Sequence, residues 1–310
     1  MKALVYTGPE VLEVRDVPEP DAPTVVAVDR AGICGSDMHA YLGHDDRRPA
    51  PLILGHEAAG TVGDRRVTIN PLVTCGQCPA CLRGATNLCP TRQIISMPPR
   101  EGAFAERVAI PEGNLIDTAL PFAKAALAEP LAVCWHAARL GLRLSEVERA
   151  IVLGGGAIGV GSALALAAMG VEDVTVVEPN PLRRATLGAM GLRAVEAGDG
   201  PTDLVVDAVG YGATRATASG LVRPGGAIVH VGLGDAAPGL DVRRLTLQEI
   251  AFLGTYAYTA DDFRDTVAAM EDGRLGALDW TEERPLSEGA RAFADIRAGK
   301  VAAPKVLLVP

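Results

Sequence analysis

Four cysteines lie within fifteen residues of this 310-residue chain, at Cys75, Cys78, Cys81 and Cys89. Four thiolates on one short loop make a closed tetrahedral site, the arrangement of structural zinc. An iron–sulfur cluster is the alternative, because two C-x2-C spacings and a final Cys-Pro pair also occur in ferredoxins. The last spacing is longer than in ferredoxins and favours zinc, but an iron–sulfur electron-transfer protein stays open as a second class of function.

A second set of metal-ligating residue types is spread along the chain. Cys34 lies in GICGSDMH, His56 and Glu57 in GHE, and Glu129 in AEPL. A catalytic zinc takes few protein ligands of mixed type and leaves one position open for water or substrate. Spacing alone leaves this set at even odds, because a buried cysteine is more often a small hydrophobic residue.

A glycine pattern, GGGAIG at residues 154–159, follows a predicted strand and begins a predicted helix. In this context G-x-G-x-x-G predicts a dinucleotide site, with the pyrophosphate at the helix N-terminus. Glu178 ends the next strand, where a carboxylate binds the adenosine ribose and repels a 2′-phosphate. NAD is therefore favoured over NADP, although Arg183 and Arg184 follow closely. The expected cofactor contacts are Gly154, Gly156, Ala157, Ile158, Gly159, Glu178 and Arg183.

Residues 1–123 are rich in Pro and Gly and contain short strand-like runs, which predict a mostly antiparallel β domain. The clearest runs are Lys2–Tyr6, Thr24–Ala31, Gly60–Ile69 and Ala103–Ile110. A helical pattern follows at Ala125–Leu142, and from Arg149 onward apolar strands alternate with helices. That alternation is typical of a parallel sheet covered on both faces. The sequence therefore predicts an α/β protein with a doubly wound parallel sheet in residues 124–259.

Composition and charge exclude several classes of protein. The formal net charge is −9, which disfavours nucleic acid as a partner because such binding depends on neutralising phosphates. No apolar run is long enough to cross a bilayer, and no signal-peptide pattern follows Met1, so we expect a cytoplasmic protein that binds no membrane. A reducing compartment also disfavours disulfides among the six cysteines.

These segments together resemble the zinc-dependent medium-chain dehydrogenase/reductase (alcohol dehydrogenase) family, in its sorbitol/polyol and threonine dehydrogenase branch. The matching segments are GICGSDMH, GHEAAG, the four-cysteine loop, GAFAE, AEPLAV, GGGAIG, VVDAVG and AGKV, in family order. The resemblance implies a mostly-β GroES-like catalytic domain, residues 1–123 and 260–310, and a Rossmann cofactor domain, residues 124–259. It also implies two zinc ions, NAD, a small-molecule alcohol substrate and a homo-oligomer, either dimer or tetramer.

The resemblance implies a role for each matching residue of the catalytic site. Cys34 and His56 match zinc ligands, and either Glu57 or Glu129 binds the ion directly. Asp37 matches a carboxylate that orients the histidine, Ser36 the start of a proton relay, and His39 its outlet to solvent. The four cysteines match the structural zinc lobe.

The expected reaction is hydride transfer between NAD and a secondary alcohol, because zinc acidifies a bound hydroxyl. A polyol or sugar alcohol, possibly phosphorylated, is the first expectation for the substrate; L-threonine and butanediol are the alternatives. The segment Gly60–Val67 is shorter than in most members, as is the one around Leu115–Phe122, but every ligand position is present.

Overall fold

The computed structural model describes residues 1–310 and divides into two compact units. Unit 1 comprises residues 1–129, 259–273 and 277–310, and unit 2 comprises residues 130–258 and 274–276. Unit 1 thus includes residues 124–129, which the sequence analysis placed in the cofactor domain. None of the helices combines the length and the apolar character needed to span a membrane.

Unit 1 is built on a seven-stranded sheet in the order β10-β6-β5-β3-β18-β17, with β9 also paired to β3. These strands are β3 (Val25–Gly32), β5 (Glu57–Val62), β6 (Arg65–Ile69), β9 (Arg107–Ala109), β10 (Leu115–Asp117), β17 (Thr281–Pro285) and β18 (Lys305–Val309). A three-stranded sheet, β2-β1-β4, and a two-stranded sheet, β7-β8, complete the unit. Their strands are β1 (Lys2–Gly8), β2 (Val11–Asp16), β4 (Leu52–Ile53), β7 (Leu72–Val73) and β8 (Gln93–Ile94).

The helices of unit 1 are short and lie between or after the strands. They are α1 (Gly35–Tyr41), α2 (Pro79–Leu82), α3 (Phe122–Ala125), α9 (Ala260–Glu271) and α10 (Gly289–Arg297), with 3-10 turns at Thr86–Leu88, Glu112–Asn114 and Leu286–Glu288. The longer helix α4 (Ala128–Gly141) begins in unit 1 and continues in unit 2.

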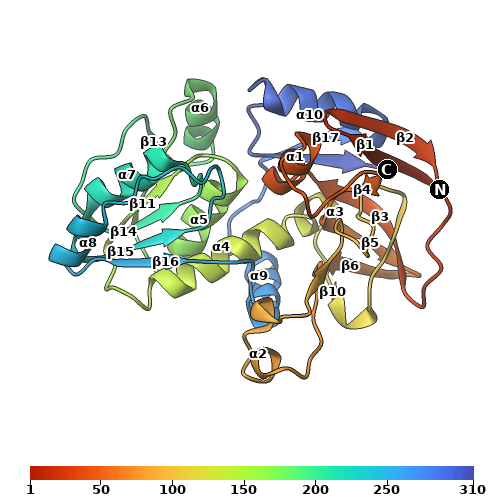
Figure 1. The fold of residues 1–310 in the computed structure, drawn as a ribbon, viewed down its shortest axis with the longest axis horizontal. Helices are drawn as coiled ribbons and strands as arrows, with labels where there is room; N and C mark the ends of the chain where they lie inside the picture. Colours follow the sequence, from red (N-terminus) through yellow and green to blue (C-terminus); the bar gives the residue numbers. More distant parts are fainter. The chain divides into compact units, whose positions relative to one another are not determined.

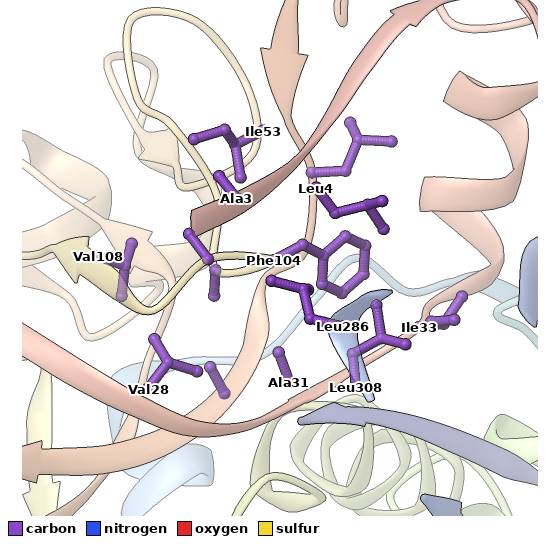
Figure 2. Packing of buried hydrophobic residues seen from close by; sticks show 14 of the residues in the cluster. Ala3, Leu4, Val28, Ala31, Ile33, Ile53, Phe104, Val108, Leu286 and Leu308 are labelled. Atoms are coloured by element: carbon purple, nitrogen blue, oxygen red, sulfur yellow. The ribbon is translucent and has the colours of Figure 1, made fainter. Parts of the chain in front are cut away.

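The core of unit 1 collects apolar side chains from both of its larger sheets (Figure 2). Leu4 of β1, Ala31 of β3 and Leu308 of β18 are fully buried there. Phe104 lies among them and contacts Phe293 of α10 edge to face, with ring centroids 6.0 Å apart. The strand-like runs of the sequence predicted that one face of each strand would be buried, as it is here.

In two places the strands of unit 1 differ from the prediction. The run Gly60–Ile69 is not one strand: it contains the end of β5, a two-residue turn at Gly63 and Asp64, and β6, and β5 and β6 pair as a hairpin. Gly63 has a φ of +57°, a conformation that glycine adopts at little cost. Strand β2 was not predicted, because five of its six residues are exposed and give little apolar signal.

Unit 2 contains a six-stranded parallel sheet in the order β13-β12-β11-β14-β15-β16. The strands are β11 (Arg149–Leu153), β12 (Asp173–Val177), β13 (Arg193–Val195), β14 (Thr202–Asp207), β15 (Val222–His230) and β16 (Ala251–Gly254). The connecting helices are α5 (Ala157–Ala168), α6 (Pro181–Ala189), α7 (Gly212–Leu221) and α8 (Val242–Leu247). Figure 1 shows these elements in green to blue.

The strand order of unit 2 explains why both faces of its sheet are covered. From β11 the chain moves outward through β12 to β13, and from β14 it moves outward in the opposite direction to β16. Because such crossovers are right-handed, helices on the two arms lie on opposite faces. The doubly wound parallel sheet predicted from the sequence is confirmed, and its middle strands are buried as expected.

Candidate metal and dinucleotide sites

Three strands of unit 1 bring distant parts of the chain to one point. Strand β3 runs antiparallel to both of its neighbours, with Gly32 opposite Glu57 on β5 and opposite Leu307 on β18. The end of β3 therefore meets the beginnings of β5 and β18. Cys34 follows β3 directly, and Lys305 begins β18. This junction assembles side chains that are about 270 residues apart in sequence.

Cys34, His56 and Glu57 form a compact cluster at this junction. Each offers one ligand atom, and these atoms all lie within 4.8 Å of one another. His56 and Glu57 are buried, and Cys34 is half-buried. A thiol, an imidazole and a carboxylate in this arrangement suit Zn²⁺, which takes sulfur, nitrogen and oxygen donors. Glu129, in the first turn of α4, is buried but is not among the residues within 4.8 Å.

Asp37 supports the histidine of this cluster. Its Oδ1 lies 3.4 Å from His56 Nδ1, and its carboxylate also accepts from the backbone N–H groups of Cys34, at 3.0 Å, and Gly55, at 3.2 Å. A proton on Nδ1 leaves the other ring nitrogen for a metal, which is the role the sequence analysis expected of Asp37.

Charges around the cluster favour a cation inside it. Burial alone would lower the pKa of His56, but the negative charges of Asp37 and Cys34, and hydrogen bonds to both, raise it well above its usual value. Burial alone would raise the pKa of Asp37. The positive charges of His56 and Arg48 outweigh this effect and lower the pKa below its usual value. Negative charge around His56 thus stabilises a positive charge at this position.

Lys305 is a buried cation that the sequence analysis did not single out. Its Nζ lies 2.6 Å from both carboxylate oxygens of Glu57 and 3.0 Å from the carbonyl oxygen of Ile33. Burial disfavours the charged form, yet Glu57, then Cys34 and Glu129, raise its pKa above the usual value. The only feature of the sequence that could have indicated this role is a single lysine at the start of an apolar strand.

Arg48 and Ser96 also support the cluster without having been predicted. Arg48 is buried and donates to the carbonyl oxygens of Ser96, at 2.9 Å, and Ser36, at 3.0 Å. The hydroxyl of Ser96 lies 3.3 Å from His56 Nδ1, so it shares that nitrogen with Asp37. Ser96 has a φ of +70°, which is unusual for a residue other than glycine.

The residues expected to move a proton lie on or beside helix α1. Ser36 is half-buried, and its hydroxyl lies 3.4 Å from Arg48 Nη2. His39, in the same helix, is also half-buried. The short helix begins at the Cys34 turn, so the ligand and both relay residues are positioned by one element.

The four cysteines of the loop after β7 converge on one point. Their sulfur atoms all lie within 4.8 Å of one another, with Cys89 3.6 Å and Cys81 4.0 Å from Cys75. A zinc ion bound to four thiolates places the sulfurs about 3.8 Å apart. The geometry thus suits a single tetrahedral ion. In a multi-iron cluster the thiolates bind different iron atoms and stand farther apart.

The thiols of Cys81 and Cys89 differ in acidity. Hydrogen bonds from the backbone N–H of Cys75 and from the Thr91 hydroxyl lower the pKa of Cys89 to about 6. Burial and the neighbouring thiol of Cys78 raise the pKa of Cys81 to about 11. Such different pKa values arise when neighbouring thiols share protons. A metal ion that displaces these protons binds favourably to the four sulfurs.

The glycine turn of unit 2 has the shape that a dinucleotide requires. Gly154 has a φ of +99°, and a Cβ on Gly159 would lie 1.7 Å from the carbonyl oxygen of Gly154, so both positions exclude larger residues. Beside Gly156, at the N-cap of α5, a Cβ would meet no atom within 4 Å. That open position leaves the helix N-terminus, with Ala157 and Ile158, accessible to a pyrophosphate.

Glu178 lies directly beside this turn. One carboxylate oxygen accepts from the N–H of Gly155 and the other from the N–H of Asn180, both at 2.8 Å. Arg183 lies 4.0 Å from the same carboxylate. The backbone donors hold the carboxylate in place, and its remaining lone pairs can accept from ribose hydroxyls.

The sixth cysteine takes no part in either cluster. Cys134 is fully buried in α4 and donates to the carbonyl oxygens of Pro130, at 3.0 Å, and Ile158, at 3.2 Å. It fills the space that Gly161 leaves on α5, where a Cβ would lie 2.6 Å from its sulfur.

Comparison with known proteins identifies the two domains of the chain. The model of the alcohol dehydrogenase GroES-like domain matches residues 20–121, and that of the zinc-binding dehydrogenase matches residues 157–272. The L-galactonate-5-dehydrogenase of Escherichia coli is 31% identical, covering 89% of each chain. The sorbitol dehydrogenase of Bacillus subtilis is 33% identical over 75% of each chain.

A solved structure shows the same fold over the whole length. It is a zinc-binding dehydrogenase of Sinorhizobium meliloti bound to NADP, 26% identical, with a TM-score of 0.89 over 100% of this chain and 99% of the other. The sequence, the domain order and the fold of the chain therefore all match those of zinc-binding dehydrogenases. The chain belongs to the zinc-dependent medium-chain alcohol dehydrogenase family of NAD(P)-dependent oxidoreductases.

Proposed function

We propose that this chain is an NAD-dependent dehydrogenase that oxidises a secondary hydroxyl of a polyol or sugar-derived substrate. The observation that carries the proposal is the cluster of Cys34, His56 and Glu57, whose ligand atoms lie within 4.8 Å of one another, with His56 and Glu57 buried. The relatives named for sorbitol and L-galactonate support a polyhydroxy substrate. L-Threonine and butanediol are the alternatives within the family.

The residues of unit 1 divide the work of the proposed site. Cys34, His56 and one of the two glutamates hold the zinc, and Asp37 keeps the imidazole oriented. Bound zinc supplies a Lewis acid that acidifies the substrate hydroxyl, and bound NAD accepts the hydride. Ser36 takes the hydroxyl proton, and His39 passes it to solvent.

The choice of NAD rests on Glu178. Its carboxylate is fixed by two backbone N–H groups beside the glycine turn, where the 2′-phosphate of NADP would meet a negative charge. The S. meliloti structure contains NADP, so cofactor choice varies among proteins of this fold. We further propose a homo-oligomer, dimer or tetramer, in a reducing compartment such as the cytoplasm, where the lobe thiols stay available for zinc.

The test is a substrate panel combined with metal analysis. Sorbitol, xylitol, L-galactonate, L-threonine and 2,3-butanediol are offered with NAD or NADP, and zinc per chain is measured. We expect two zinc ions and turnover of a polyhydroxy substrate with NAD. Cys34→Ala should lose one zinc ion and the turnover. The control is Cys134→Ala, which removes a buried thiol outside the two clusters and should keep the two zinc ions and the turnover. The proposal fails if no secondary alcohol is oxidised, or if Cys34→Ala remains active.

A further inference from the structure

Unit 1 contains a cavity of about 550 Å³ that belongs to neither of the two sites described above. Its lining comes from strands β1, β2, β4 and β9 and from the loop at residues 99–102. No lining residue is a candidate zinc ligand, and none lies in the dinucleotide unit. The volume is within the range of small-molecule sites, about 300–1,000 Å³. The cavity is therefore a candidate for a separate ligand site.

The floor of the cavity is apolar and stiff. Val5, Leu52, Ile53 and Val108 line it and are each at most 6% exposed. Figure 2 shows two of them, Ile53 and Val108, within the core of unit 1. The wall contains four prolines, at residues 18, 20, 51 and 99. Proline has a fixed φ and no N–H group, so these positions keep their shape and offer no donor. A ligand that fills this space needs an apolar body.

Arg100 is the charged group of the lining that the protein leaves without a counter-ion. Its Nε donates to the uncharged amide of Gln93 at 2.8 Å, which leaves the two terminal nitrogens for a ligand. The loop that carries it is fastened to β4, because the N–H of Gly102 donates to the carbonyl oxygen of Ile53 at 2.8 Å. A guanidinium presents paired donors whose planar geometry matches a carboxylate.

The other charges of the lining limit the ligand to one negative charge. Arg15 pairs with Glu13 at 2.6 Å, and both side chains are about half exposed. Arg107 pairs with Glu19 at 3.4 Å at the same rim. Glu101 also lines the cavity, and one of its oxygens accepts from a backbone N–H of β4 at 2.7 Å. Since these charges nearly balance, a dianion would lack a second free cation and would be repelled by the glutamates.

We propose that this cavity binds a small monocarboxylate with an apolar chain or ring. The carboxylate pairs with Arg100, and the apolar part lies on the floor formed by β1, β4 and β9. The site lies entirely within unit 1 and needs neither zinc nor NAD, so the proposal is independent of the proposed function. The competing interpretations are an apolar hollow that a second copy of the chain covers, and an arginine that is only solvated.

The experiment is isothermal titration of the zinc-loaded protein with octanoate as the probe. Octanamide keeps the chain but lacks the charge, and acetate keeps the charge but lacks the chain. We expect one octanoate per chain. Octanamide should bind at least ~10-fold more weakly, because a charge-assisted contact is lost, and acetate at least ~100-fold more weakly, because little apolar surface is buried. The proposal is overturned if octanoate does not bind, or if either analogue binds as tightly as octanoate.

Two variants locate the bound probe. Arg100→Gln should weaken octanoate binding at least ~10-fold. Val17→Trp enlarges a half-buried residue of the lining and should abolish binding while Arg100 stays in place. The control is Arg143→Gln, which removes an exposed arginine of unit 2 and should change the affinity by less than about twofold. Unchanged binding in Arg100→Gln and Val17→Trp, or an equal loss in Arg143→Gln, would overturn the proposal.

Two further measurements exclude the other interpretations. Cys34→Ala should keep octanoate binding within about twofold; if binding is lost there and kept in Arg100→Gln, octanoate is a ligand of the metal cluster and the proposal is wrong. Sedimentation of Val17→Trp should show the wild-type oligomeric state, since a change would mean that a second copy covers the cavity. Octanoate binding that depends on Arg100, in a protein that oxidises no secondary alcohol, would leave this proposal standing while the proposed function fails.

Discussion

In the proposed function, the choice between the two nicotinamide cofactors depends on a single carboxylate. Glu178 is 4% exposed and is held by the N–H groups of Gly155 and Asn180. We expect Glu178→Ser to shift the ratio of kcat/KM for NAD over NADP toward NADP by ~10- to 100-fold, because the repulsion of a 2′-phosphate is lost while Arg183 stays nearby. Steady-state kinetics with both cofactors measure this.

A matched control is available on the adjacent strand end. Glu196 follows β13 and is mostly exposed, where it pairs with Arg184 at 3.5 Å. Glu196→Ser should leave the cofactor ratio unchanged within about twofold, since solvent screens an exposed charge. Equal shifts in both variants would show that general surface charge, and not the fixed carboxylate, sets the preference.

Single residues differ in how well the sequence alone predicts them. The cysteines of the lobe and the glycines of the turn were predicted because their spacing is local, and the structure gathers each set. Lys305, Arg48 and Ser96 were not predicted. Their roles arise from tertiary pairing, for example between residues 57 and 305, and no local pattern distinguishes such a lysine from a solvated one.

Elements were predicted well where their apolar pattern is complete. The alternation of strands and helices in unit 2 was predicted, because buried parallel strands are continuous apolar runs. In unit 1 the hairpin β5–β6 was read as one strand, since its two-residue turn carries only one glycine. The junction of β3, β5 and β18 could not be predicted, because strand pairing across the sheet is not encoded in any one segment.

The loop between β14 and α7 depends on a buried carboxylate at the end of the strand. Asp207 accepts from the N–H groups of Val209, at 3.1 Å, and Gly210, at 2.9 Å, and from the Thr214 hydroxyl, at 2.9 Å. Burial raises its pKa, but the His230 imidazole, 3.2 Å away, and these donors lower it below the usual value. The ionised form is therefore the one that stabilises the loop.

We expect Asp207→Asn to lower the free energy of opening of this loop by about 2 kcal/mol at pH 7, since hydrogen bonds to a charged acceptor are lost. Because the folded pKa is depressed, the stabilisation is present above the unfolded pKa, near 3.9, and is lost as the pH falls through the folded value. The two proteins should thus converge below about pH 4. Hydrogen exchange of the Val209 and Gly210 amides measures the difference locally, without interference from metal loss in unit 1.

Asp173→Asn serves as the control for this element. Asp173 begins β12 and is half-exposed, where it pairs with Arg193 at 3.3 Å. Its loss should change the opening free energy of the β14–α7 loop by less than about 0.5 kcal/mol. A difference for Asp207→Asn that persists undiminished at pH 3 would contradict the assignment of the stabilisation to the ionised carboxylate.

At the scale of the whole molecule, the two halves of the proposed chemistry belong to different units. The candidate ligands of the catalytic zinc and the four cysteines of the lobe all lie in unit 1, whereas the glycine turn and Glu178 lie in unit 2. Each unit has its own buried core. Metal binding and dinucleotide binding are therefore expected to be separable by mutation.

We expect Cys34→Ala to keep its affinity for NADH within about threefold while turnover falls at least ~1000-fold, because a Lewis acid contributes several kcal/mol to the reaction and nothing to the dinucleotide turn. Gly156→Val should do the reverse. Its side chain enters the open position at the N-cap of α5, so NADH binding is lost and the zinc content is unchanged. NADH fluorescence titration and metal analysis of both variants measure the two effects. Loss of NADH binding in Cys34→Ala, or of zinc in Gly156→Val, would show that the metal and dinucleotide sites are energetically coupled and that neither unit forms its site alone.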